Sequence, residues 1–348
     1  MMLLRTGLWV VILAATIWLL VVGRGLLLPL VLGLVVWYMV DAAADSFEKL
    51  HFGRHKLPRW TAVVAAIACI AVFFWFLGTV IGRNIKAVLA AAPDYETRLE
   101  TMLHRGAQLL GFEQMPTLPE MFARINLVDL IGDVAGALAN VVGMIGVVLV
   151  YAAFFLVEQI YFGRKLQALF PDPARLARVR DVLDRISADI HRYIQIKSAL
   201  AAMTCAVGYA VMTLVGVDFA GFWAVLIFFL YFIPTLGSIV AIAAPALLTL
   251  VQFATLTPFL IVLLVFGPVQ ILMANAVEPA IMGRSLNLSP LVIIGSLMLW
   301  GTIWGVIGMF LCVPIMVVLM IVLANFEQTR PIAILLSANG EVPRPAVD

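Results

Sequence analysis

A long stretch without charged side chains is the feature that most constrains the fold of this chain. Residues 219–277 contain no Asp, Glu, Lys, Arg or His. A transmembrane helix needs about 20 apolar residues to cross the hydrocarbon core of a bilayer. The whole chain is 64% hydrophobic and 12% charged, whereas a soluble domain carries about 25% charged residues. The sequence therefore predicts an all-α polytopic membrane protein, surrounded by membrane lipids.

The apolar runs predict about eight transmembrane segments, two of which are broken or re-entrant. An external region of two short helices, broken near Pro116 and Pro119, and a cytoplasmic amphipathic helix are expected beside them. The predicted division of the chain is a three-span bundle over 1–82, an external polar segment over 83–129, a long fourth span over 130–162, a cytoplasmic amphipathic helix over 163–196, a transport region with broken helices over 197–326, and a cytoplasmic tail over 327–348.

The distribution of Lys and Arg predicts the orientation of the chain in the membrane. Segments 44–59 and 158–197 together carry twelve Lys/Arg, whereas the polar segment 83–127 balances five basic with five acidic residues. Short cytoplasmic loops of membrane proteins carry an excess of Lys and Arg. We therefore expect the first two segments in the cytoplasm, segment 83–127 outside, and both termini cytoplasmic.

Segment 173–196 has the spacing of an amphipathic helix. Its apolar residues recur every three or four positions and are Leu176, Val179, Leu183, Ile186, Ile190 and Ile194. Such a stripe is buried on one face of a helix. One interpretation is a cytoplasmic helix that packs on its own protein. The other is a helix on the membrane surface or on a neighbouring subunit, which would also suit a scaffold that binds partners without transporting anything.

Two apolar blocks, 221–253 and 291–323, have a length that suits neither one straight span nor two complete ones. Both are interrupted near the middle, the first at Pro234 and Gly237 and the second at Gly301 and Gly305. One interpretation is a re-entrant hairpin of two short arms. The other is a long kinked helix whose glycines allow close packing.

Paired interruptions in two parts of a transporter sequence point to its binding site, because broken helices at membrane depth survive where they line a cavity or are buried. Gln270 and Asn275 are polar within an apolar run, and they could instead be hydrogen-bond partners between helices. The residues predicted to bind or gate a substrate are Pro234, Thr235, Gly237, Ser238, Gln270, Asn275, Glu278, Arg284, Gly301, Thr302 and Gly305.

Glu278 and Arg284 are the only charged residues between Asp218 and Glu327. Ionisable groups beside membrane spans tend to be paired, buried in protein or functional. One interpretation is a gate, or a contact to substrate or proton. The other is a solvated cytoplasmic turn. The apolar residues 280–282 favour a partly buried Glu278–Arg284 pair.

Motifs for other functions are missing from the sequence. It has no H-E-x-x-H, no G-x-S-x-G and no G-x-x-x-x-G-K-[ST], so neither an enzyme nor a nucleotide-driven pump is expected. Its three cysteines lie in apolar runs and form no C-x-x-C pair, so no metal site or cofactor is predicted. The net charge of +2 gives no basis for nucleic-acid binding.

Several segments, in the same order, resemble the autoinducer-2 exporter family of bacterial inner-membrane transporters. They are LLLPLVLGLVVWYMVD (26–41), FFLVEQIYFGRKLQALFP (154–171), YFIPTLGSIVAIAAPALL (231–248), VEPAIMGRSLNLSPLVI (277–293), WGTIWGVIGMFLCVP (300–314) and FEQTRPIAILLS (326–337). The resemblance implies a permease or exporter in the bacterial inner membrane, a homo-oligomer with pentamers expected, and an elevator-like movement. A small polar solute such as autoinducer-2, the signal of quorum sensing, is the implied substrate. Cation/proton antiport is the alternative within the same family.

Overall fold

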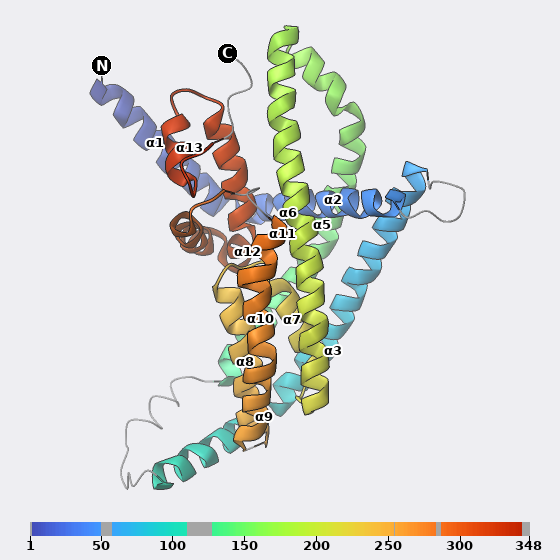
Figure 1. The fold of residues 1–348 in the computed structure, drawn as a ribbon, viewed down its shortest axis with the longest axis vertical. Helices are drawn as coiled ribbons and strands as arrows, with labels where there is room; N and C mark the ends of the chain where they lie inside the picture. Colours follow the sequence, from blue (N-terminus) through green and yellow to red (C-terminus); the bar gives the residue numbers. More distant parts are fainter. Residues whose placement is uncertain (1, 50–57, 110–126, 254, 283–286, 343–348) are drawn as a thin grey trace. The chain divides into compact units, whose positions relative to one another are not determined.

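The computed structural model describes the whole chain except residues 1, 50–57, 110–126, 254, 283–286 and 343–348 (Figure 1). The described residues are helical and contain no strand, apart from an isolated bridge between Leu288 and Ser337. The helices are α1 (Met2–Val22), α2 (Arg24–Lys49), α3 (Arg59–Leu109), α5 (Leu127–Leu169), α6 (Pro173–Val215), α7 (Ala220–Leu230), α8 (Leu236–Phe253), α9 (Leu256–Ile261), η1 (Val262–Phe266), α10 (Gly267–Leu272), η2 (Met273–Val277), α11 (Glu278–Met282), α12 (Pro290–Ala324) and α13 (Arg330–Leu336), where η1 and η2 are π-helical turns.

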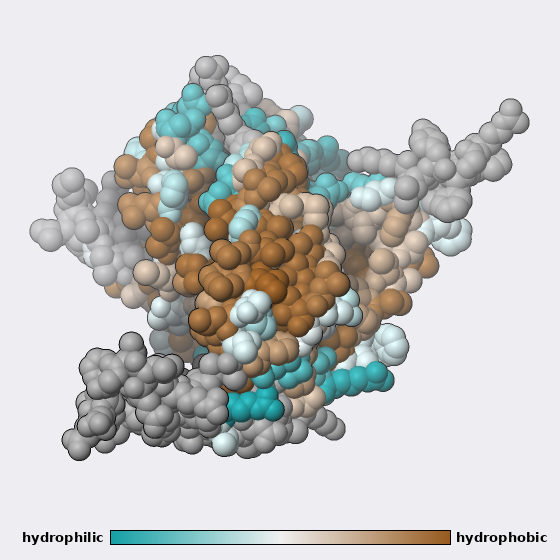
Figure 2. Space-filling view, turned by 60° about the horizontal axis from the view of Figure 1, so that its bottom comes forward, coloured by the Kyte–Doolittle hydropathy of each residue, from teal (hydrophilic) through white to brown (hydrophobic). Residues whose placement is uncertain are grey.

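Seven helical stretches among the described residues are long and apolar enough to cross a membrane. Large apolar side chains are exposed along them, and Figure 2 shows a face on which such side chains form a wide continuous area. Apolar patches of this kind are rare on soluble monomers, but lipid covers them in a membrane. The predicted class, an all-α polytopic membrane protein, is thus confirmed.

The chain forms two compact units. Unit 1 comprises residues 1–67, 145–196 and 282–348, and unit 2 comprises residues 68–144 and 197–281. Helices α3, α5 and α6 each continue from the residues of one unit into those of the other.

Unit 1 contains α1, α2, α12, α13 and parts of α3, α5 and α6. Helices α2 and α5 approach closely at Gly33, where an added Cβ would lie 2.6 Å from the Cβ of Tyr151. The indole Nε1 of Trp304 in α12 donates a hydrogen bond of 3.0 Å to the carbonyl of Leu20 in α1. Backbone hydrogen bonds also join residues 287–289 to residues 336–338 near the end of the chain.

Unit 2 contains α7 to α10 and the remaining parts of α3, α5 and α6. Phe266, Ile227 and Met212 are fully buried in its core and come from η1, α7 and α6. Gly208 of α6 lies against the rings and methyl groups of this core, since an added Cβ there would be 2.9 Å from Ile227 Cδ1. The core therefore fixes α6, α7 and the η1 segment against one another.

Two helices are longer than the sequence predicts. The amphipathic segment and the fifth span form one helix, α6, and Ile190 and Ile194 of its apolar stripe are buried. This burial supports packing on the same protein. Helix α3 extends to Leu109, so the first of the two expected external helices is a continuation of a span. The break expected near Pro116 and Pro119 lies outside the described residues.

Candidate functional site

The first long apolar block is broken where the sequence predicts. Helix α7 ends at Leu230, residues 231–235 form turns, and α8 begins at Leu236. A helix of 11 residues is about 16 Å long, roughly half of the 30 Å hydrocarbon core. Helix α7 is therefore too short to span a membrane on its own.

Gly237 shows how sharply the chain turns at this break. A Cβ added to Gly237 would lie 1.7 Å from the carbonyl oxygen of Leu230. In a straight helix two residues seven positions apart are about 10 Å apart along the axis. The start of α8 is therefore folded back against the end of α7, and only glycine fits at the contact. The interpretation of 221–253 as a single kinked helix is wrong.

The second apolar block contains a break of the same kind, in unit 1. Gly305 has φ 64° and ψ −145°, which interrupts α12 in a conformation that is accessible mainly to glycine. A Cβ added to Gly308 would lie 1.9 Å from the carbonyl oxygen of Trp300. Each unit thus holds one folded-back helix pair, with a glycine three positions after the interruption packed against a backbone carbonyl of the preceding arm.

An ion pair lies beside the first break, within unit 2. The ammonium Nζ of Lys197, from α6, is 2.7 Å from Oε1 of Glu278, the first residue of α11. The side chain of Lys197 is 7% exposed and that of Glu278 is 18% exposed. Charged side chains are this deeply buried only when they are paired. The pair therefore joins α6 to α11 in surroundings of low dielectric constant.

Tyr231, in the turn after α7, completes this cluster. Lys197 Nζ donates a hydrogen bond of 3.3 Å to the backbone carbonyl of Tyr231 and lies 4.9 Å from the centre of its ring. The C-terminal end of a helix carries unpaired carbonyls and a partial negative charge, which favour a cation. Lys197 thus satisfies a carbonyl that the break has freed, and the aromatic ring adds a cation–π contact.

The π-helical turn η2 sets the position of Glu278. The backbone N–H of Glu278 bonds to the carbonyl of Met273, five residues earlier, instead of to the residue four positions back. The additional residue in this turn rotates the following side chains by about 100° around the helix axis. Such wide turns are frequent at functional sites. Here the turn precedes the acidic residue of the pair.

Gln270 and Ser238, both predicted site residues, are brought together in unit 2. Gln270 Nε2 lies 3.4 Å from Ser238 Oγ, and the residue is completely buried. Its amide oxygen Oε1 has no hydrogen-bond partner among the described residues. A buried acceptor without a partner is costly. The contact supports the interhelical role expected for Gln270 and leaves one acceptor available to a ligand.

The other predicted site residues have more local contacts. Asn275 and Thr302 donate to carbonyls four residues back on their own helices, and both residues are exposed. Thr235 adopts a positive φ of 58° in the turn, and its hydroxyl bonds to the carbonyl of Pro234. Gly301 packs against the side chain of Met309 across the second break.

The predicted pairing of Glu278 with Arg284 stays a prediction, because Arg284 lies outside the described residues. Lys197 was not among the predicted site residues and was counted with the basic residues of a cytoplasmic segment. A signal was present: Lys197 follows Ile190 and Ile194 at helical spacing, so it continues the apolar stripe of α6. A lysine on an apolar stripe is expected to be buried with a partner.

Broken helix pairs in a helical membrane protein, one of them beside a buried ion pair, are typical of transporters. The model of the AI-2E family transporters matches residues 8–328. The chain belongs to this family and is a membrane transporter.

Two relatives cover most of the chain. The chain is 27% identical to "AI-2 transport protein TqsA" of Escherichia coli strain K12 over 320 aligned residues. The aligned residues cover 90% of this chain and 89% of that protein. The chain is 28% identical to "Putative transport protein" of Haemophilus influenzae over 293 aligned residues. The aligned residues cover 81% of this chain and 83% of that protein.

Proposed function

We propose that this chain is a permease or exporter of the bacterial inner membrane that moves a small polar organic solute such as autoinducer-2. The observation that carries the proposal is the cluster of Lys197, Glu278 and Tyr231 at the break of the first helix pair. A solute rich in hydroxyl groups needs donors and acceptors at membrane depth. Such donors and acceptors lie close in sequence to this cluster. They are the freed backbone groups of the turn, the hydroxyl of Ser238 and the unpaired oxygen of Gln270.

The relatives support this substrate class. TqsA carries autoinducer-2 transport in its name, and the present chain aligns with nearly all of it. The sequence contains no nucleotide-binding motif. We therefore propose that the energy comes from a gradient, either of the solute itself or of protons or sodium ions.

We further propose an elevator-like movement, both termini in the cytoplasm, and assembly into a homo-oligomer, with pentamers expected. The division of the chain into two compact units, each with its own broken helix pair, supports such a movement. Helix pairs that pack closely at a glycine favour an elevator-like movement, because each pair can move as a rigid body. The excess of Lys and Arg in segments 44–59 and 158–197 supports the orientation.

Cation/proton antiport is the second candidate, and the buried acid Glu278 favours it. A carboxylate that is paired in one state of the protein and released in another can bind a proton and a cation in turn. Glu158 of α5 is half exposed and paired with Lys165, so it fits this role less well.

A transport assay with purified protein in proteoliposomes tests the proposal and separates the two candidates. The solutes are autoinducer-2, pentoses of similar size, and sodium or potassium ions, each with and without a proton gradient. We expect saturable flux of autoinducer-2 that empty liposomes lack. Cation flux driven by the proton gradient, with no flux of organic solute, would replace the permease proposal with the antiporter.

A further inference from the structure

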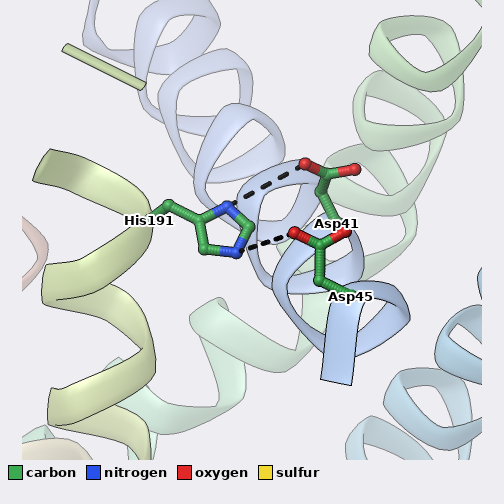
Figure 3. Close-up of side chains that lie close together, drawn as sticks. All are labelled: Asp41, Asp45 and His191. Carbon is green, nitrogen blue, oxygen red and sulfur yellow. Dashed lines mark ion pairs between the residues drawn. The ribbon is translucent and has the colours of Figure 1, made fainter. Parts of the chain in front are cut away.

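A second group of ionisable side chains lies in unit 1 and has no part in the proposed transport site. Asp41 and Asp45 are one turn apart on α2, so both carboxylates lie on one face of that helix. His191 comes from α6. Figure 3 shows its imidazole ring reaching toward the two carboxylates. The three residues are each about one-sixth to one-third exposed, with side-chain values of 23% for Asp41, 36% for Asp45 and 16% for His191.

In each aspartate, Oδ1 is directed at Arg59 and Oδ2 is directed at His191. Oδ1 of Asp41 lies 3.0 Å and Oδ1 of Asp45 lies 3.9 Å from the guanidinium of Arg59. Oδ2 of Asp41 lies 3.9 Å from His191 Nδ1, and Oδ2 of Asp45 lies 3.7 Å from His191 Nε2. One edge of the carboxylate pair therefore belongs to Arg59, while the other edge is directed at the imidazole.

The contacts on the imidazole side are too long for hydrogen bonds, which span about 2.7–3.2 Å. His191 Nε2 is buried and has no hydrogen-bond partner among the described residues. The ligand atoms of the three residues lie within 4.8 Å of one another. Two ligands of one tetrahedral zinc ion, each about 2.0–2.2 Å from the metal, are separated by roughly 3.5 Å. An imidazole gives one nitrogen to one ion, so side-chain shifts of up to about 1.3 Å would place the three groups around one ion.

The charge of the group also favours a cation. Three carboxylates, those of Asp41, Asp45 and Asp184, and two guanidiniums, those of Arg59 and Arg192, surround the group, so one negative charge is left over when His191 is neutral. Asp41, Asp45 and His191 line a cavity of about 410 Å³ whose other walls include the side chains of Asp184, Ser187, Arg192 and Gln195. The cavity is open to one side, so water could fill the remaining coordination positions of an ion.

We propose that Asp41, Asp45 and His191 bind one divalent transition-metal ion of the zinc type, which ties α2 to α6 within unit 1. An imidazole nitrogen beside carboxylate oxygens selects zinc, cobalt or nickel over magnesium and calcium, which prefer oxygen ligands alone. The carboxylate oxygens that bind the ion are those directed away from Arg59, so the ion and the guanidinium share the two aspartates.

Direct metal titration tests this proposal. The full chain, purified in detergent with a tag that contains no histidine and then stripped with a chelator, is titrated with Zn²⁺ and with Co²⁺. We expect one equivalent of Zn²⁺ per chain in competition with a chromogenic chelator, and a visible Co²⁺ spectrum of low coordination number. His191→Gln and Asp45→Asn should each weaken binding more than about tenfold, because even indirect partners of a metal ligand are worth that much.

Two further variants distinguish a specific metal site from non-specific electrostatic attraction of cations. Asp184→Asn removes a charge from the wall of the same cavity but no ligand, so it should retain the one equivalent. Arg59→Gln removes the competing cation and should tighten binding several-fold. Absence of stoichiometric binding, or binding that His191→Gln and Asp45→Asn leave unchanged, would overturn the proposal and leave a cluster that the neighbouring guanidiniums of Arg59 and Arg192 neutralise. Size-exclusion profiles confirm that each variant is folded.

Discussion

Removing the charge of Lys197 should damage the protein more than removing both charges of its ion pair. In Lys197→Met the carboxylate of Glu278 would keep its burial, with 18% of the side chain exposed, but would lose the ammonium 2.7 Å away. Breaking a buried pair from one side costs about 3–5 kcal/mol. Because Glu278 retains some access to solvent, we expect the lower end, about 3 kcal/mol.

The double variant Lys197→Met with Glu278→Gln leaves no buried charge. Replacing both partners of a buried ion pair by uncharged groups is often close to neutral, so we expect a loss of about 1 kcal/mol, mainly from the lost hydrogen bond to the Tyr231 carbonyl. If Glu278→Gln alone costs about 1–2 kcal/mol, the coupling energy between the two sites is about 3 kcal/mol. This corresponds to roughly a hundredfold difference in an equilibrium constant.

The assay is a double-mutant cycle on unfolding in detergent, repeated for solute flux in proteoliposomes at equal protein density. We predict that Lys197→Met is the least stable and least active of the three variants, and that the second substitution partly rescues it. Strictly additive effects would show that the two residues do not act as a pair. A parallel cycle with Arg284→Gln tests whether Glu278 has a second cationic partner, as the sequence predicts.

Three further predictions follow from the site and the topology. Gly237→Ala should prevent normal folding of the first helix pair and reduce the yield of monodisperse protein, whereas Gly295→Ala, where an added Cβ would meet no atom within 4 Å, should not. Gln270→Leu should preserve thermal stability, because it removes a buried amide with one unpaired oxygen, but should lower flux at least about tenfold; normal flux would remove Gln270 from the site. A membrane-impermeant thiol reagent applied to intact cells should label a cysteine at position 108 but not one at position 180, and the reverse pattern would invert the topology.

The class of fold and the two breaks were predictable because they depend on local chemistry. Composition alone requires a lipid environment, and Pro234, Gly237 and Gly305 interrupt helices through their own backbone properties. The continuity of α6 was also readable in principle, since no Gly or Pro separates its amphipathic part from its apolar part. A boundary was expected there because hydropathy changes, but a change of hydropathy does not end a helix.

The partners of the charged residues were not predictable in the same way. Glu278 was assigned to Arg284 because the two are close in sequence, whereas Lys197 lies on a helix that only the packing of unit 2 brings near. The same holds for Asp41, Asp45 and His191, whose meeting depends on how α2 and α6 pack. When two residues pair across helices that are distant in sequence, the sequence shows at most an unusual helical position of one of them, such as a lysine on an apolar stripe.

Protection of a single cysteine by the transported solute tests most directly whether the first break forms the transport site. Ser238→Cys is placed in a chain whose three native cysteines are replaced, and Gly295→Cys on α12 serves as the control. The rate of reaction with a membrane-permeant maleimide is measured in proteoliposomes with and without autoinducer-2. We predict that the solute slows labelling at position 238 in a saturable manner and leaves position 295 unchanged. Unchanged labelling at position 238, in liposomes that do transport the solute, would contradict the account and place the site elsewhere.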